Sequence, residues 1–472
     1  MPRGWDRLEW LLQAPTMRKL WHTPWRFLLM MGTFVPLYAG YLWLWIRHFK
    51  LKWKVPAEKW RKTHVKNARR FYKLAVRMKG GLIKVGQIVS TRVDIMPKEW
   101  IDGLEGLQDR VDPLPWKKIE KHLTSEFGAP PDEVFAEISH EAVAAASFGQ
   151  VHRAKTKDGR DVALKVKYAD IDMKLGCDLF VFRCSVPLFN IFIPKVDLKV
   201  IHREVAQALV TELNYQQEAE YTRMIGKNLE EVEDVIVPEV VEEFTTESVI
   251  CTTYFEGIKI TNTEARHEAG LVDEQPIIKK IIEAYAHMFF VDGVFQSDPH
   301  PGNLFVRPGP NGPQVCILDF GQVKILPKDF QRKLVMASIA FMGRDVDNFC
   351  KAIVDMDVLS PEDVETARPL IQEFFDDLYE MSPAELKQLD AEATKEKIMG
   401  VVDRIGDVTI PQDIVLYGRA FGLLGGVIAA LDPDVNGVVV AKPVIMRALM
   451  RPENFAPLPD ESGPDVAAAV PA

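Results

Sequence analysis

The chain has 472 residues, 47% hydrophobic and 26% charged, which is ordinary globular composition with room for two or three domains. Residues 1–80 carry 18 Lys and Arg against three Asp and Glu, whereas the other 392 carry 40 against 64, so a basic arm precedes an acidic body. The five cysteines are scattered with no Cys-x-x-Cys pair, which argues for a reducing compartment and against a disulfide framework or a zinc site. The ten histidines include no His-Glu-x-x-His motif.

An apolar run occupies residues 27–46, where twenty consecutive residues carry no charge. That length just spans the hydrocarbon core of a bilayer. Eight of the ten Trp lie in the first 60 residues, and basic residues flank the run on both sides, as in segments that anchor at headgroup level. We therefore expect a membrane-associated protein whose arm meets an anionic lipid surface rather than nucleic acid, with its body in the cytoplasm.

Other interpretations of this run are open at this stage. It is long enough to cross the bilayer, but deep insertion at the interface fits equally well. A soluble helical hairpin, broken at Pro36 and Gly40 and packed on the protein, is the third alternative. A cleaved signal peptide is not expected, because the preceding segment is long and Trp-rich and no small-x-small cleavage site follows.

Helical periodicity follows the apolar run. Residues 57–78 predict a basic amphipathic helix, residues 80–92 (GGLIKVGQIVSTR) a second helix, and residues 116–127 a third. Lys84 and Gln87 are three residues apart and share one face of the second helix. By pattern alone, this pair is also consistent with a solvated polar stripe.

A hairpin is predicted from residues 144–154 (AAASFGQVHRA), a turn at 157–159 and an alternating run at 161–167. The order is similar to a kinase nucleotide loop followed by the strand that carries the phosphate-binding lysine. Alanines and a serine stand where glycines are usual, but small side chains still let a backbone approach phosphates. The residues expected to line the nucleotide are Ala145, Ala146, Ser147, Phe148 and Gly149.

Lys165 is the expected phosphate-binding lysine, and Lys167, on the same face of the strand, is expected to be exposed. Residues 201–229 predict one long amphipathic helix, where a kinase has the glutamate that pairs with this lysine. Four glutamates compete for that role: Glu204, Glu212, Glu218 and Glu220. On one helix, Glu212 and Glu218 would project about 120° apart.

Residues 249–257 (VICTTYFEG) predict a strand that leads into a hinge between two lobes. The backbone from Thr253 to Phe255 is expected to meet an adenine ring. The chain after this strand is predicted to be nearly all helical, for example at 276–290 and 328–341, and the Pro-rich acidic tail is predicted to be disordered.

Two motifs in the second half of the chain carry the chemistry. In the first, Asp298-Pro-His-Pro-Gly-Asn303, an aspartate precedes an asparagine by five residues; the second is Asp319-Phe-Gly, after a short apolar strand at 314–318. A kinase-type site needs one carboxylate to orient the attacking hydroxyl, and an amide and a second carboxylate to hold magnesium on the nucleotide phosphates. The sequence therefore predicts Asp298 as the catalytic residue and Asn303 and Asp319 as metal ligands.

With these pieces in order, the chain resembles the UbiB family of atypical kinases (the AarF/ADCK group). The resemblance runs from about Lys84 to about Pro433. The segments that carry it are KVGQ at 84–87, AAASFGQVHR at 144–153, VALKV at 162–166, Glu212 to Glu218, DPHPGN at 298–303, DFG at 319–321, Arg419-Ala420 and LDP at 431–433.

The resemblance implies an α+β protein-kinase-like fold of two lobes, with an N-terminal helical (KxGQ) extension and a mostly helical C-lobe. It implies that Lys84 and Gln87 fold across the active site, that Lys84 pairs with Glu212, and that Glu218 pairs with Lys165. ATP and Mg²⁺ are the implied cofactors. The domains expected are an arm at 1–54, the extension at 55–128, an N-lobe at 129–257, a C-lobe at 258–450 and the tail at 451–472.

The resemblance also implies ATP binding and ATPase behaviour in support of isoprenoid quinone (ubiquinone-like) biosynthesis at a membrane. Membrane lipids, isoprenoid quinone precursors and quinone-biosynthesis enzymes are the partners it suggests. One position departs from the family pattern: the family's Glu-x-Asp reads Glu212-Leu-Asn214 here, which puts the role of that aspartate in question.

Two other functions remain alternatives. A small-molecule phosphotransferase of the aminoglycoside or choline kinase type has a similar catalytic loop, although Gln296 stands where those enzymes commonly carry histidine and KVGQ argues against it. A nucleotide-gated scaffold for lipid-modifying enzymes would need no turnover. Phosphorylation of other proteins is not expected, because few residues follow Gly321 before the next predicted helix and no Ala-Pro-Glu follows. The sequence leaves the oligomeric state open.

Overall fold

The computed structural model describes residues 24–91, 96–107, 113–145, 148–189, 205–207, 209–380, 411–432, 435 and 437–450. These residues form two compact units. The first holds the described residues up to Gln217 and Val240–Tyr254, and the second holds Glu218–Glu239 and those from Phe255 onward. Several predictions fall outside the described residues: the arm before residue 24, Ala146, Ser147, Glu204 and the tail at 451–472.

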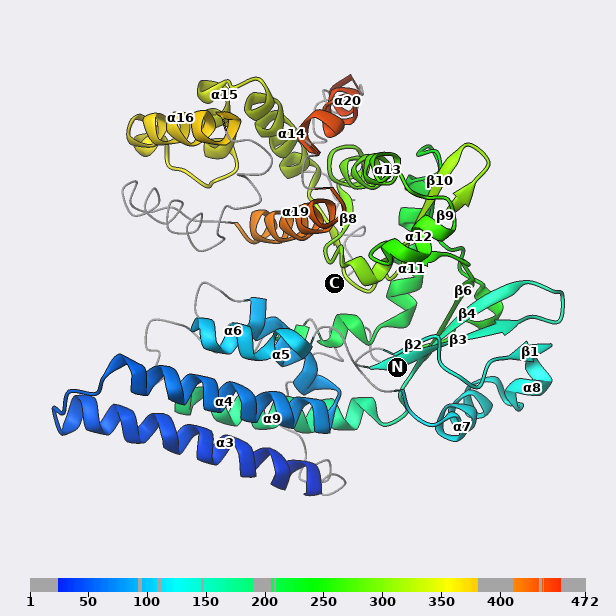
Figure 1. Ribbon diagram of the computed structural model, residues 1–472, viewed down its shortest axis with the longest axis horizontal. Helices are drawn as coiled ribbons and strands as arrows, with labels where there is room; N and C mark the ends of the chain where they lie inside the picture. The colour runs from blue at the N-terminus through cyan, green and yellow to red at the C-terminus, as the bar shows by residue number, and fades with distance from the viewer. Residues whose placement is uncertain are drawn as a thin grey trace, which may run out of the picture. The chain divides into compact units, whose positions relative to one another are not determined.

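The first unit begins with a layer of helices (Figure 1). Its members are α3 (Pro24–Trp45), the π turn η1 (Ile46–Lys50), α4 (Ala57–Met78), α5 (Gly81–Thr91), α6 (Lys98–Leu104), η2 (Glu105–Leu107) and α9 (Ile171–Phe189). In Figure 1, α3, α4 and α9 lie side by side. α3 continues through Pro36 and Gly40, so the break expected for a hairpin within residues 27–46 is wrong. The hairpin is formed by α3 and α4 instead.

A five-stranded antiparallel sheet completes this unit, together with α7 (Trp116–Phe127) and α8 (Pro131–Val134). Its strands are β1 (Glu137–Ile138), β2 (Ala144–Ala145), β3 (Gly149–Lys155), β4 (Asp161–Lys167) and β6 (Val249–Thr253), in the order β1-β3-β4-β6 with β2 also on β3. The predicted hairpin is β3–β4, and Val162, Leu164 and Val166 of β4 are fully buried. The alternation of residues 161–167 therefore predicted the strand correctly.

The second unit contains a four-stranded sheet and a two-stranded ladder among its helices. The strands are β5 (Val235–Ile236), β7 (Ile258–Lys259), β8 (Val294–Gln296), β9 (Leu304–Gly309), β10 (Gly312–Ile317) and β11 (Val323–Ile325), with β5-β10-β9-β7 in the sheet and β11–β8 in the ladder. The chain after residue 257 was predicted nearly all helical, so most of these strands correct that prediction. They are short, and too few residues alternate in each to show a period.

Helices make up the rest of the second unit. They are α11 (Tyr215–Asn228, shared with the first unit), α12 (Thr263–Glu268), α13 (Gln275–Ala286), the π turn η4 (His287–Asp292), α14 (Lys328–Met342), α15 (Val346–Asp355), α16 (Val364–Glu380), α19 (Gln412–Leu431) and α20 (Gly437–Met450), with 3-10 turns η5 (Pro301–Asn303) and η6 (Pro361–Asp363). The 3-10 turn η3 (Glu242–Phe244) belongs to the first unit. α13 packs on β10, and its Ile277, Ile278, Ile281 and Ile282 are buried. This core holds β8, β9 and β10, the short strands next to the DPHPGN and Asp-Phe-Gly motifs.

The single helix predicted over residues 201–229 is wrong. Helical residues before Leu213 are followed by a turn, and α11 starts afresh at Tyr215. The side-chain oxygen of Asn214 accepts a hydrogen bond from the Gln217 backbone N–H at 3.2 Å, which is the bond of a helix N-cap. Glu212 and Glu218 therefore belong to different helical segments, and the angle expected between them does not apply.

Candidate active site

The first motif, at 298–303, forms a tight loop after β8. The His300 N–H donates to the Asp298 carbonyl at 2.7 Å, and the Asn303 N–H donates to the His300 carbonyl at 2.9 Å. His300 Nδ1 also accepts a hydrogen bond from the Gly302 N–H at 3.0 Å. These short-range bonds fold the loop so that Asp298 and Asn303 lie on one small segment.

The second motif lies directly beside the first. Ile317 pairs with Leu304 in the β10–β9 ladder, and the Leu318 N–H donates to the Asn303 carbonyl at 2.8 Å. Asp319 follows at once, so the two predicted metal ligands come from neighbouring backbone positions. The structure thus brings Asp298, Asn303 and Asp319 together within one unit.

Asp319 has an unusual backbone conformation, with φ of 61°. Non-glycine residues in this left-handed region are uncommon and cluster at functional sites. Its Oδ1 accepts a hydrogen bond from the Gly321 N–H at 3.0 Å. A Cβ on Gly321 would lie 3.2 Å from this oxygen and 3.5 Å from Glu218 Oε2, so Glu218 also lies next to the Asp-Phe-Gly turn.

Gln296 holds the two motifs together, a role that sequence reasoning missed. Its fully buried side chain donates from Nε2 to the carbonyls of Leu318 at 2.8 Å and Asp319 at 2.5 Å. Its Oε1 accepts a hydrogen bond from the Tyr285 hydroxyl. Burial, with a smaller contribution from the charge of Asp298, raises the pKa of Tyr285, so this hydroxyl stays a proton donor.

Arg419 is a second residue whose place in the site was missed. It extends from α19 and pairs with Asp298, with 3.7 Å between Nη2 and Oδ1. Both side chains are more than a third exposed, so the pair is worth little to stability. This position places a positive charge beside Asp298, the predicted catalytic residue. The sequence had singled out Arg419 only as part of a family-like helix.

The donor set fits a kinase-type magnesium site. No group of three His, Cys, Asp or Glu side chains in the described part of the chain could hold a metal on its own. Mg²⁺ on a nucleotide, however, is typically bound by one or two carboxylates, with phosphate oxygens and water completing its octahedron. Asp319 and Asn303 supply a carboxylate and an amide oxygen for that arrangement.

Lys165 lies in the first unit, half-buried on β4 between Val151 of β3 and Ile250 of β6. Its Nζ stands 5.3 Å from the centre of the Tyr215 ring. Lys167 was expected to be exposed, but it is 5% exposed and its Nζ donates to the Leu213 carbonyl at 3.4 Å. The start of α11 covers this face of the strand, which alternation along the strand alone cannot predict.

The alanine-rich loop is described on either side of Ala146 and Ser147. Ala145 pairs with Gln150 across β2–β3, and the Phe148 side chain is 2% exposed in the hydrophobic core. Only the backbone of Phe148 could therefore meet a nucleotide. A Cβ at Gly149 would lie 2.5 Å from the Val166 carbonyl oxygen and 2.6 Å from the Tyr215 hydroxyl, so close packing requires glycine here.

The KxGQ residues are packed within the first unit rather than solvated: Lys84, Val85 and Gly86 are buried and Gln87 is half-buried. Lys84 is 8% exposed and forms an ion pair with Glu212, as the family resemblance implied. Gln87 donates from Nε2 to the Leu107 carbonyl at 3.1 Å. A Cβ on Gly86 would come within 2.3 Å of the Leu107 side chain, so the glycine lets α5 pack closely against η2.

Some expected contacts join residues of different units and stay predictions. Lys165 and Glu218 belong to different units, as do Thr253 and Phe255 of the hinge. Thr253 ends β6 opposite Val162. The Phe255 ring lies under the Arg307 guanidinium, with 4.5 Å between them.

An antiparallel sheet with a lysine on its central strand, a DPHPGN loop and an Asp-Phe-Gly turn define a protein-kinase-like α+β fold of two lobes, as predicted. The sequence profile of the ABC1 atypical kinase-like domain matches residues 106–353, more than half of the chain. The protein therefore belongs to the ABC1 atypical kinase family, within the UbiB/ADCK group.

Relatives and a solved structure agree with this assignment. The chain is 31% identical over 398 residues to ACTIVITY OF BC1 COMPLEX KINASE 8, a chloroplastic protein of Arabidopsis thaliana, covering 78% of this chain and 52% of the relative. It is 30% identical to an uncharacterized protein of Synechocystis sp., covering 78% of this chain and 53% of the relative. The chain thus spans about half the length of these relatives.

A solved structure has a similar fold, the complex of Rv3197 with erythromycin from Mycobacterium tuberculosis. It aligns with a TM-score of 0.50 at 24% identity, covering 77% of this chain and 91% of the other.

Proposed function

We propose that this protein binds ATP with Mg²⁺ and transfers or hydrolyses its terminal phosphate. The observation that supports this most is the hydrogen-bonded junction of the two motifs, in which Leu318 bonds to Asn303 and Gln296 bonds to Asp319. Phosphoryl transfer depends mainly on positioning and charge neutralisation, and this junction positions the groups that would supply both.

Each residue has a separate task in the proposal. Asn303 and Asp319 hold the metal, which when bound neutralises charge on the phosphates. Lys165 contacts the α- and β-phosphates and Glu218 orients it. Asp298 orients the nucleophile, and Arg419 places a positive charge 3.7 Å from its Oδ1.

The phosphate acceptor is proposed to be water or a lipid-derived hydroxyl rather than another protein. Between Gly321 and the start of α14 at Lys328 there is room only for the short strand β11, which pairs with β8. A peptide-docking activation segment needs a longer free stretch. The proposal places this chemistry at a membrane, with the body in the cytoplasm, in support of isoprenoid quinone biosynthesis.

Membrane association is supported by composition rather than by any bound lipid. The helical stretch Pro24–Lys50 is long and apolar enough to cross a bilayer, with 22% of its most apolar window buried in the protein. A soluble core helix or a signal sequence can pass the same test.

Hydrolysis of ATP tests the proposal. Purified protein with Mg²⁺ and ATP should release phosphate, faster with anionic vesicles, and Asp298→Asn should lower kcat by about a hundredfold or more. A generic protein substrate should stay unlabelled. Efficient labelling of such a substrate, or an Asp298→Asn variant as active as wild type, would contradict the proposal.

A further inference from the structure

Two opposite faces of α3 differ in what covers them. Buried residues recur on one face: Arg26, Met30, Leu37, Tyr41 and Leu44. At about 3.6 residues per turn, the exposed apolar residues fall on the other face. These are Trp25, Leu28, Val35 and Trp43, each more than half exposed. The helix is thus a packed element of the first unit whose opposite face presents an exposed apolar stripe.

Bonds at both ends fasten α3 to the rest of its unit. Arg26 makes a two-pronged ion pair with the buried Asp178 of α9, at 2.7 and 2.6 Å, and donates to the Met78 carbonyl at 2.7 Å. Further along the helix, the Tyr41 hydroxyl bonds to Trp100 Nε1 at 2.9 Å and to His64 Nδ1 at 2.8 Å. α3 therefore cannot leave α4 and α9 without breaking buried polar contacts.

α4 runs antiparallel to α3 along its length. Contacts between the two helices join Arg26 to Met78 and Tyr41 to His64, and Phe34 packs edge-on against Phe71 at 6.1 Å. Any orientation of α3 in a bilayer thus fixes that of α4.

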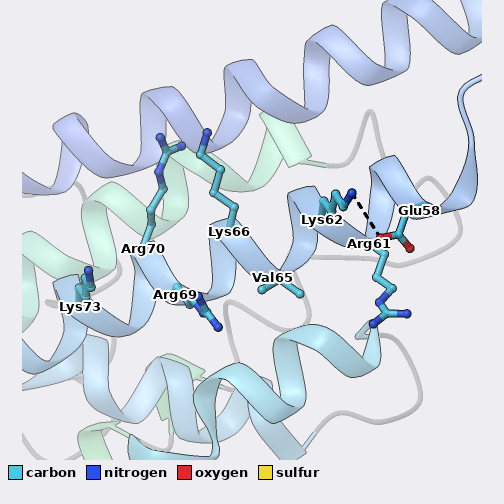
Figure 2. A pocket seen from close by; sticks show the side chains of 8 residues that line it. All are labelled: Glu58, Arg61, Lys62, Val65, Lys66, Arg69, Arg70 and Lys73. Carbon is cyan, nitrogen blue, oxygen red and sulfur yellow. Dashed lines mark ion pairs between the residues drawn. The ribbon is translucent and has the colours of Figure 1, made fainter.

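The outer face of α4 is strongly basic. A hollow of about 430 Å³ on it is lined by Glu58, Arg61, Lys62, Val65, Lys66, Arg69, Arg70 and Lys73 (Figure 2). The dashed line in Figure 2 marks the ion pair between Lys62 and Glu58, at 3.6 Å. None of Lys66, Arg69, Arg70 and Lys73 pairs with a carboxylate in the described part of the chain, so their charge is available to a partner.

The basic and apolar surfaces meet in a second hollow, of about 260 Å³, between the two helices. α3 contributes Leu29, Gly32, Thr33 and Pro36, and α4 contributes Arg70, Lys73, Leu74 and Arg77. Cations beside an apolar stripe with exposed Trp match the two layers of an anionic bilayer surface, its phosphates and the acyl chains beneath them.

We propose that the α3–α4 pair docks flat on an anionic lipid bilayer, with α3 lying in the interface rather than crossing the membrane. If α3 crossed, the basic face of α4, fastened alongside, would enter the hydrocarbon core, where charged side chains are strongly disfavoured. Lying flat, α3 buries its apolar stripe among the acyl chains while Lys66, Arg70 and Lys73 meet lipid phosphates. This inference rests on the proposed membrane association and selects its geometry.

Vesicle flotation without nucleotide tests the docking surface. Full-length protein should bind vesicles of phosphatidylcholine with 30% phosphatidylglycerol, and the triple variant Lys66→Glu, Arg70→Glu, Lys73→Glu should bind about tenfold or more weakly. The matched control reverses three exposed lysines of α7: Lys117→Glu, Lys118→Glu and Lys121→Glu. It should bind as wild type does.

The outcomes separate the two proposals. If the wild-type protein does not float with any vesicles, both membrane association and the docking surface are contradicted. If wild type and the α4 triple variant float equally well with the anionic vesicles, only the docking surface is contradicted. If the triple variant does not fold, the neutral set Lys66→Gln, Arg70→Gln, Lys73→Gln replaces it, with weaker binding again expected.

The orientation of α3 is tested by labelling its two ends. Pro24→Cys and Leu51→Cys place thiols at exposed positions flanking the helix, in a Cys184→Ser background because the four other cysteines are buried. With sealed vesicles, a membrane-impermeant maleimide should label both positions without detergent. Labelling of one end only until detergent is added would overturn the in-plane geometry in favour of a span.

Discussion

Asn214 stands where the family's aspartate is expected, and the structure shows a task that both residue types perform. Its side-chain oxygen accepts the Gln217 N–H at 3.2 Å and starts α11, the helix that carries Glu218. Asparagine and aspartate are about equally good N-caps. The departure from the family pattern therefore preserves the local geometry.

The first prediction follows from this cap. Asn214→Asp should unfold at nearly the same denaturant concentration as wild type, whereas Asn214→Ala should lower the free energy of unfolding by about 1 kcal/mol. Urea titration followed by circular dichroism measures both. An alanine variant as stable as wild type would show that the cap has no energetic weight.

At the residue scale, sequence spacing predicted the groups that lie close along the chain and missed those that meet through folding. Asp298, Asn303 and Asp319 come from two short motifs, and hydrogen bonds do bring them together. The contacts of Gln296 with Tyr285 and of Arg419 with Asp298 join separate elements, which no local pattern reveals. The predicted exposure of Lys167 was wrong for the same reason, because the start of α11 covers its side of the sheet.

At the scale of elements, α5 is fixed to the helical segment before Asn214 by the Lys84–Glu212 ion pair. The Lys84 side chain is 10% exposed and that of Glu212 22%. Removing one partner of a mostly buried pair leaves the other charge desolvated and uncompensated, which typically costs more than removing both.

A double-mutant cycle is the second prediction. Lys84→Ala and Glu212→Ala should each destabilise the first unit, and the double variant should be more stable than the sum of the two effects implies, by about 1–3 kcal/mol. Lys121→Ala, an exposed lysine on α7, is the control for losing a lysine alone. If the changes in unfolding free energy caused by Lys84→Ala and Glu212→Ala are additive in the double variant, the ion pair does not stabilise the contact between these segments.

The helices α4, α7 and α14 were predicted almost to the residue, because each is long, amphipathic and flanked by proline at its N-terminal end. The break at Asn214 was missed because hydrophobic spacing continues across it. A cap signal was nevertheless present, an asparagine followed within one turn by Gln217 and Glu218.

For the whole molecule, three partly or fully buried histidines of the first unit make stability depend on pH. Burial lowers the pKa of His64, His122 and His152 below the ordinary value. For His64 and His122, nearby carboxylates oppose this shift. At His152, Nδ1 lies 2.8 Å from the Ser139 carbonyl and Nε2 lies 2.9 Å from the Gln150 amide nitrogen, which fits the neutral ring.

The third prediction gives the sign of this dependence. A depressed histidine pKa means that the unfolded chain binds more protons, so these groups stabilise the fold above the ordinary value of about 6.5 and that contribution is lost as pH falls below it. Thermal unfolding should therefore occur at lower temperature at pH 5.5 than at pH 7.5. Histidine-selective NMR should show His152 less than half protonated at pH 6.5; half-protonation at or above that pH would contradict the lowered pKa.

The α+β kinase-like fold was predictable from motif order, whereas the placement of the apolar helix was not. The sequence of residues 27–46 is equally consistent with a membrane span, an interfacial helix or a core helix, because hydrophobicity alone does not show which face packs on the protein. The buried contacts of Arg26 and Tyr41 with other helices identify that face.

The proposed chemistry requires a divalent metal held by Asp319 and Asn303 on a bound nucleotide. Electron paramagnetic resonance of Mn²⁺ with ADP tests this without requiring turnover. Wild type should take up Mn²⁺ only when ADP is present, and Asp319→Asn should weaken that uptake at least about tenfold, as expected when a metal loses its carboxylate. Asp329→Asn, an exposed aspartate on α14, should behave as wild type. Equal uptake by Asp319→Asn and wild type would contradict the central claim.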